Sequence, residues 1–159
     1  MGIADQFKPA DVVLNLHAAS KRALLETLAA EAAKRLGRPA EDILDALRSR
    51  EKLGSTALGR GIALPHARLQ GAFAPLVLIA RLGAPIDYEA RDEVPVDLVI
   101  LVLWPEAEAE GFLPALSATC RALRAPQALR RLRHASTGEE VVATMARYSQ
   151  AGAAEDDES

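Results

Sequence analysis

The chain has 159 residues, of which 50% are hydrophobic and 26% charged, with a formal net charge of -3. This length predicts one compact domain, because a domain typically takes roughly 100 to 200 residues. The composition excludes a disordered, collagen-like or disulfide-scaffold protein. The single cysteine, Cys120, excludes an internal disulfide, and no zinc-ligand set stands at the usual spacing. These features predict a reduced, cytoplasmic setting.

Neither end of the chain predicts a membrane segment. The first residues lack the apolar core of a signal peptide, and the longest apolar run, Leu98 to Trp104, is too short to cross a bilayer. Residues 151–159 are acidic and carry no large apolar side chain, which predicts a disordered tail. No membrane insertion is expected.

The first 54 residues predict one strand and two helices. The β-branched run Val12–Leu16 is typical of a strand, and Ser20 then opens a stretch with leucines at helical spacing that ends at Gly37. A second helix is expected to begin near Pro39, a residue tolerated in the first turn, and to end at Gly54.

Three apolar runs in the middle of the chain predict further strands. Ile62–Leu64 is short and closed by Pro65, which places His66 at a strand end. Runs 76–80 and 98–103 are almost continuously apolar, a pattern typical of strands buried on both faces. Two prolines are expected to separate these runs, Pro85 and Pro95.

Three helices are predicted after Pro105. The first is an amphipathic segment over 109–123, and the second begins at Pro126. A third is expected to start at Ser136, which forms a capping box with Glu139 three residues later. Strands interleaved with helices predict the α/β class, and no internal repeat suggests a solenoid.

Side chains suited to phosphate chemistry are concentrated in residues 50–68. Glycines there allow backbone N–H groups to approach an anion, and hydroxyl and guanidinium groups can bind phosphate oxygens. His66 adds an imidazole, which is largely neutral near pH 7 and can attack phosphorus as a nucleophile. The segment predicts a phosphorylatable histidine with these phosphate-binding candidates: Arg50, Ser55, Thr56, Arg60 and Arg68.

Residues 50–68 also fit two other interpretations, an ordinary histidine and a nucleotide-binding loop. A lone histidine after a proline is more often an ordinary residue, but a phosphoryl group adds about two negative charges, and the nearby arginines can balance them. Gly54 and Gly59 imitate the spacing of a nucleotide P-loop. The lysine and hydroxyl residue of that loop are missing, and the order of strand and helix is reversed, which excludes it.

The remaining histidines, the cysteine and the basic residues receive no chemical role. His17 is expected to be an ordinary residue at a strand end, His134 to complement a helix C-terminus, and Cys120 to be a small core residue. The arginine-rich stretch 121–133 contains no interleaved aromatic residue, so a solvated helix face is favoured and nucleic-acid binding is not expected.

The run Leu58–Ala67, LGRGIALPHA, resembles the active-site signature of enzyme IIA of the bacterial phosphoenolpyruvate-dependent sugar phosphotransferase system, in its mannitol/fructose class. The preceding run Arg50–Thr56, REKLGST, resembles the nitrogen-regulatory branch, and the similarity extends from about Ala10 to Tyr148. It implies a single domain with a mixed β-sheet flanked by α-helices on both faces. Residues 1–150 would form this enzyme IIA type-2 domain, followed by the tail 151–159.

The resemblance also implies a mechanism. His66 would accept a phosphoryl group on Nε2 from the phosphohistidine of an HPr-like phosphocarrier, with Nδ1 in an orienting hydrogen bond, while Arg50 steadies the phosphate. No metal, nucleotide or other cofactor is implied. Two positions depart from the family: Phe112 stands where many relatives carry a second active-site histidine, and Arg60 where they often carry Asn or an acidic residue.

Three functions follow from this resemblance. The favoured one is a regulator whose phosphorylation at His66 changes its binding to other proteins. The first alternative is a sugar-transport IIA component that passes the phosphoryl group to a IIB component. The second is a degenerate binding module that is not phosphorylated, motivated by Phe112 and opposed by the presence of His66 and Arg50.

Overall fold

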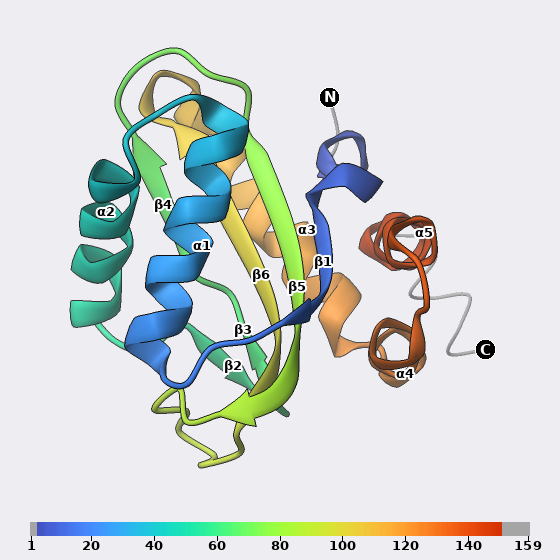
Figure 1. Ribbon diagram of the computed structural model, residues 1–159. Helices are drawn as coiled ribbons and strands as arrows, with labels where there is room; N and C mark the ends of the chain where they lie inside the picture. The colour runs from blue at the N-terminus through green and yellow to red at the C-terminus, as the bar shows by residue number, and fades with distance from the viewer. Residues whose placement is uncertain (1–2, 151–159) are drawn as a thin grey trace. The chain divides into compact units, whose positions relative to one another are not determined.

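The computed structural model describes residues 3–150, which fall into two compact units (Figure 1). Among these residues, one unit combines 3–12 with 108–150, and the other spans Val13–Ala107. The tail predicted over 151–159 lies outside the described residues, and the extent of the domain stays a prediction. Within 3–150 no helix has both the length and the apolar character that crossing a membrane requires.

The 13–107 unit is built on a six-stranded sheet. Five strands follow the order β1-β5-β6-β3-β2, and β4 pairs with β6. β5 runs antiparallel to β6, whereas β3 and β4 run parallel to it, so the sheet is mixed and β6 is its centre. The α/β class and the mixed sheet are confirmed. The strands are β1 Val12–Leu16, β2 Ala57–Gly59, β3 Ile62–Ala63, β4 His66–Leu69, β5 Leu76–Ile86 and β6 Val96–Pro105.

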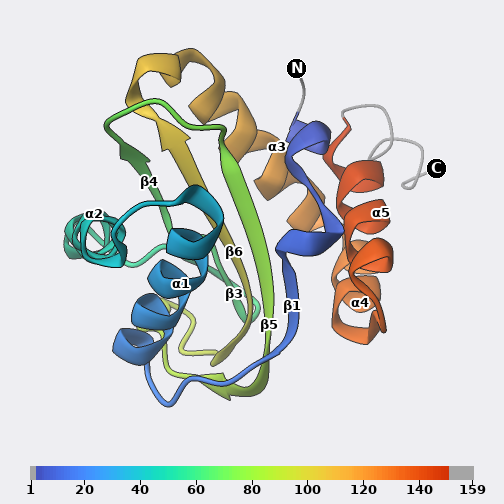
Figure 2. The same cartoon turned by 45° about the horizontal axis from the view of Figure 1, so that its top comes forward.

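Two helices, α1 (Lys21–Leu36) and α2 (Ala40–Lys52), lie side by side on one face of this sheet (Figures 1 and 2). Ser20 caps α1 by accepting a hydrogen bond from the Ala23 N–H, and Gly37 ends the helix with φ 65. These predicted boundaries are confirmed. The helices and the strands share one apolar core, whose fully buried members include Leu24, Leu28, Ile43, Leu47, Leu78 and Leu101.

Three details of the strands differ from the prediction. His66 is the first residue of β4 and not the end of the preceding strand, and the three-residue strand β2 was not expected. β5 continues to Ile86, so Pro85 lies inside a strand. The pairing of β5 with β6 shifts register between Arg81 and Ile86, and a proline is tolerated there because the regular ladder is interrupted.

The other unit contains the C-terminal helices. α5 contacts α3, α4 and the two short N-terminal 3-10 helices. Thr137, and not the predicted Ser136, caps α5 by accepting from the Glu140 N–H at 3.2 Å. The pairs 136/139 and 137/140 have the same spacing, so the pattern alone did not select between them. The helices are η1 Ile3–Gln6, η2 Pro9–Asp11, η3 Glu106–Gly111, α3 Phe112–Arg124, α4 Pro126–His134 and α5 Gly138–Ser149.

Candidate phosphoryl-acceptor site

His66 stands at the start of β4, next to the central strand of the sheet. The Val102 N–H of β6 donates to the Pro65 carbonyl at 3.0 Å, and His66 pairs with Val102 in register. Ala67 and Leu69 enter the core, so strand alternation places the His66 side chain on the other face of β4. The imidazole is half-buried.

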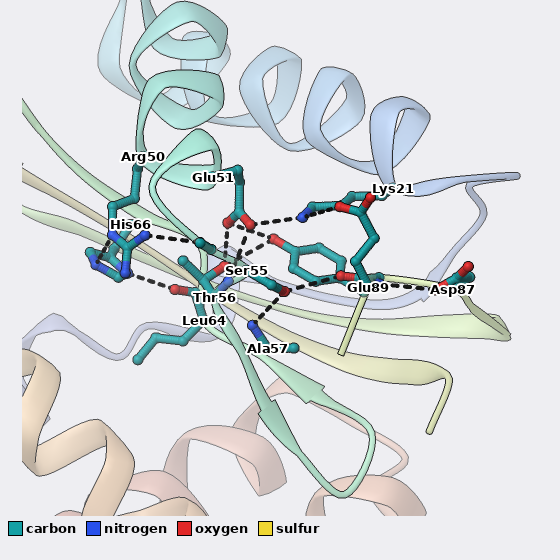
Figure 3. A network of polar contacts seen from close by, with 12 residues as sticks. Lys21, Arg50, Glu51, Ser55, Thr56, Ala57, Leu64, His66, Asp87 and Glu89 are labelled. Carbon is teal, nitrogen blue, oxygen red and sulfur yellow. Dashed lines mark hydrogen bonds and ion pairs between the residues drawn. The ribbon is translucent and has the colours of Figure 1, made fainter. Parts of the chain in front are cut away.

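Hydrogen bonds to both ring nitrogens define the state of His66 (Figure 3). Nδ1 lies 2.7 Å from the Leu64 carbonyl oxygen, and because a carbonyl only accepts, Nδ1 carries the proton. Nε of Arg50 lies 3.2 Å from Nε2, and because a guanidinium only donates, Nε2 presents its lone pair. The contacts therefore select the neutral tautomer with a nucleophilic Nε2.

The surroundings of His66 also favour the neutral ring. Burial lowers the pKa of His66 because the charged form loses hydration, and the positive charge of Arg50 lowers it further. The hydrogen bond to the Leu64 carbonyl and the charge of Glu51 act in the opposite direction. The net effect is a lowered pKa, so the nucleophilic form predominates at neutral pH.

Arg50 reaches His66 from the last turn of α2. Its Nη1 donates to the Gly54 carbonyl at 3.0 Å, so the guanidinium joins the imidazole to the turn that follows the helix. This turn is closed by hydrogen bonds from Leu53 N–H to the Arg50 carbonyl and from Gly54 N–H to the Glu51 carbonyl. Gly54 has φ 146, a conformation that favours glycine. Helix end and turn together orient the guanidinium.

A polar network lies beside this pair and centres on the carboxylate of Glu51, whose side chain is 7% exposed. The carboxylate accepts from the Thr56 N–H at 3.1 Å, from the Thr56 hydroxyl and from the Tyr88 hydroxyl at 3.0 Å. Lys21 forms an ion pair with Glu51 at 3.0 Å and a second with Glu89 at 2.9 Å. The network joins the start of α1, the end of α2 and the segment after β5.

Sequence reasoning missed the members of this network that lie far from residues 50–68. Lys21 precedes that segment and Tyr88 follows it. In the structure the Lys21 ammonium lies 4.6 Å from the Tyr88 ring centroid, and no local sequence pattern predicts this contact. Burial raises the pKa of Tyr88 far above its usual range, and the charge of Glu51 adds to this, so the phenol stays a donor. Glu51 itself lies in the REKLGST run, and the only sequence feature that could have indicated its role is the position of an acidic residue between an arginine and a lysine.

The two predicted hydroxyl donors are engaged within the fold. The Ser55 hydroxyl donates to the Tyr88 carbonyl at 3.1 Å and accepts from the Ala57 N–H at 3.2 Å. Thr56 is buried, and its hydroxyl contacts Glu51 and Tyr88. A phosphate at His66 would compete with these partners, so a phosphate-binding role of Ser55 and Thr56 stays a prediction.

The predicted arginines differ in their placement. Arg50 contacts His66 directly. Arg68 is exposed on β4 two residues after His66, and strand alternation places the two on the same face. Arg60 is exposed between β2 and β3, with φ 58, and its N–H donates to the Asp92 carboxylate at 2.9 Å. The phosphate-binding roles of Arg60 and Arg68 stay predictions.

The other positions noted in the sequence have these locations. Phe112 is the first residue of α3 and is buried, so an apolar ring occupies the position discussed for a second histidine. His17 follows β1 and is exposed, and His134 is the last residue of α4. Cys120 is half-buried, and burial raises the pKa of its thiol. Among residues 3–150 no group of three or more His, Cys, Asp or Glu side chains could hold a metal ion.

A family model described as phosphoenolpyruvate-dependent sugar phosphotransferase system, EIIA 2, matches residues 5–148. The chain belongs to this family. It is 38% identical over 146 residues to a protein of Bradyrhizobium diazoefficiens named nitrogen regulatory protein, with 92% of this chain and 95% of that protein covered. The crystal structure of nitrogen regulatory protein IIA-Ntr from Neisseria meningitidis has a TM-score of 0.85 and 30% identity, covering 90% of this chain and 98% of that chain.

A more distant likeness concerns the fold alone. The complex of enzyme IIAMTL and phosphorylated enzyme IIBMTL from Escherichia coli has a TM-score of 0.68 at 22% identity, over 86% of this chain and 94% of that chain. The expected enzyme IIA family and its nitrogen-regulatory resemblance are thus confirmed, and the IIA chain is a phosphotransferase-system component.

Proposed function

We propose that this IIA chain is a cytoplasmic phosphoryl carrier that accepts a phosphoryl group on Nε2 of His66 from an HPr-like phosphocarrier. Its phosphorylation state then controls binding to regulatory protein targets. The observation that carries the proposal is the pair of contacts on the imidazole, Leu64 carbonyl on Nδ1 and Arg50 on Nε2. Together they supply a neutral nucleophile with a cation at the nucleophilic nitrogen.

The transfer can be followed bond by bond. The Nε2 lone pair attacks phosphorus, the P–N bond to the carrier imidazole breaks, and its electron pair returns to the carrier ring while the new P–N bond forms. Positive charge develops on the His66 ring, and the Leu64 carbonyl stabilises it through the Nδ1 proton. Arg50, displaced from Nε2 by the incoming phosphorus, can donate to a phosphoryl oxygen instead.

The regulatory output follows from charge. A phosphoryl group adds about two negative charges at the surface, enough to create or block a docking site without a change of fold. Leu53, at the end of α2 three residues after Arg50, is 83% exposed and gives this surface an apolar side chain. Similarity to proteins named nitrogen regulatory protein supports regulatory targets over a sugar-specific IIB component, which is the second candidate partner.

The function is tested by intact-mass analysis after incubation with phosphoenolpyruvate, enzyme I and an HPr-type carrier. We expect an acid-labile gain of one phosphoryl group in the wild type and in His134→Ala, and none in His66→Ala. Labelling of His66→Ala would overturn the site assignment. No labelling of the wild type by any competent carrier would favour the degenerate binding module.

A further inference from the structure

The contacts around His66 form a closed ring that begins and ends in the last turn of α2 (Figure 3). The Glu51 carboxylate accepts from the Thr56 N–H at 3.1 Å, and the Thr56 carbonyl accepts from the Leu64 N–H at 3.0 Å. The Leu64 carbonyl accepts from Nδ1 of His66 at 2.7 Å, and Arg50, the residue before Glu51, donates to Nε2 at 3.2 Å. Both partners of the imidazole are therefore linked by hydrogen bonds to one end of α2.

We propose that Glu51 is the positioning residue of this site: its buried carboxylate fixes the turn after α2 and thereby holds Arg50 against Nε2 of His66. This inference rests on the proposed phosphoryl transfer and adds a residue that contacts neither the imidazole nor the phosphoryl group. Glu51 acts through Thr56 on one side and through the helix end on the other.

The chemistry of Glu51 fits positioning better than space filling. A buried carboxylate is costly unless it is paired and hydrogen-bonded, and an apolar side chain could fill the same volume without that cost. What the carboxylate adds is two oxygens with fixed directions. Oε1 holds the Thr56 N–H and Lys21, and Oε2 holds the hydroxyls of Thr56 and Tyr88.

The turn is held from both of its ends by successive residues of α2. Arg50 binds the Gly54 carbonyl through Nη1, and Glu51 binds the Thr56 N–H. If Glu51 is removed, Thr56 loses its anchor, and the same turn that carries Gly54 is free to shift. Arg50 then loses a fixed partner, and a displacement of about 1 Å can cost on the order of a hundredfold in rate.

The charges of Glu51 and Arg50 give the inference a signature that a structural role alone would not. The charge of Arg50 lowers the pKa of His66, and the charge of Glu51 raises it by a smaller amount. Loss of the Glu51 charge with Arg50 held in place would lower the pKa of His66. Release of Arg50 would raise it. The Leu64 carbonyl, which acts on this pKa more strongly than Arg50 does, belongs to the backbone between β3 and β4 and is expected to stay on Nδ1. Because the effect of Arg50 is larger than that of Glu51, a net rise is the expected result.

The test is a double-mutant cycle with single-turnover transfer from a phosphorylated HPr-type carrier. We expect Glu51→Ala to slow transfer on the order of tenfold to a hundredfold in the wild-type background. In the Arg50→Ala background the same change should slow it by less than about threefold, because Glu51 has then lost its main route of action. Glu26→Ala, an exposed glutamate on α1, is the matched control and should leave the rate unchanged.

The pKa of His66, followed by NMR without any carrier, supplies the second readout. It should rise in Glu51→Ala and fall when the same change is made in Arg50→Ala. The inference is overturned if Glu51→Ala slows transfer as much in the Arg50→Ala background as in the wild-type background. An unchanged transfer rate in folded Glu51→Ala overturns it as well. If Glu51→Ala does not fold, Glu51→Gln and Tyr88→Phe keep the shape of the network, and a wild-type pKa and rate in both would overturn it equally.

The two proposals fail in different ways. A wild type that accepts no phosphoryl group refutes the proposed function, whereas the pKa of His66 still reports whether Glu51 holds Arg50 in place. A wild type that is labelled normally, with an additive cycle, refutes only the role of Glu51.

Discussion

Two turns of the 13–107 unit, one after α2 and one between β2 and β3, contain the glycines and arginines that predicted phosphate binding. The two turns are stabilised in different ways. In the turn after α2, side chains make the decisive contacts: Arg50 binds His66 and the Gly54 carbonyl, and Glu51 binds Thr56. In the turn between β2 and β3, the backbone is the unusual feature, because Gly59, Arg60 and Gly61 all have positive φ. Turns of similar composition thus differ in role: side chains form the site in the turn after α2, whereas the turn between β2 and β3 needs residues that tolerate positive φ.

The largest effect is expected at Arg50. Arg50→Ala removes the donor on Nε2 and the contact with the Gly54 carbonyl, so phosphoryl transfer should slow on the order of a hundredfold or more, as for loss of one preorganised donor. Single-turnover transfer to His66 measures this. Arg50→Lys should recover little, because a single ammonium cannot reproduce the fork that binds imidazole and carbonyl together. Wild-type transfer rates in both Arg50→Ala and Arg50→Lys would show that Arg50 has no role in phosphoryl transfer.

Thr56→Val tests the buried side of the same turn. The substitution keeps the shape but removes the hydroxyl between Glu51 and Tyr88, leaving one carboxylate oxygen with a missing partner. We expect the free energy of unfolding to fall by about 1 to 3 kcal/mol, measured by urea denaturation. The exposed threonine of the C-terminal unit, Thr137, caps α5, so Thr137→Val serves as a comparison in which only a cap is lost.

The two turns also show which parts of the fold and of the site local sequence patterns can predict. Local patterns predicted the boundaries of α1 and the apolar cores of β1, β3, β5 and β6, because caps and apolar runs lie within short windows. The resemblance carried by the LGRGIALPHA and REKLGST runs predicted that Arg50 acts beside His66. Lys21 and Tyr88 did not follow, because their contacts with Glu51 join segments 30 and 37 residues away that only the fold brings together. A proline after a short apolar run predicts a strand end, whereas the Pro65 carbonyl accepts from the Val102 N–H and β4 starts directly after it, at His66.

The lowered pKa of His66 makes a prediction about pH. Between the folded value and the usual value of about 6.5, the unfolded chain binds more protons at this histidine than the folded chain does. The free energy of unfolding should therefore rise with pH through this window, and acidification below it should leave His66 charged at a cost to the folded state. Urea denaturation at a series of pH values measures this. The rise should be smaller in His66→Gln, and an equal rise in both would assign it to another group.

The smallest effect is expected at Arg60, where the comparison of the two turns is sharpest. Arg60 has φ 58, which is unfavourable for a long side chain but tolerated by asparagine, and its N–H bond to Asp92 does not depend on the side chain. Arg60→Asn should therefore raise the free energy of unfolding by about 0.5 kcal/mol, because asparagine is several-fold enriched at positive φ. The rate of phosphoryl transfer separates the backbone from the guanidinium. A stabilised variant that transfers at nearly the wild-type rate would show that position 60 matters only for the backbone conformation of the turn. A fall toward the Arg50→Ala rate would show that the Arg60 guanidinium reaches the phosphoryl group. In that case both turns would bind phosphate through their side chains.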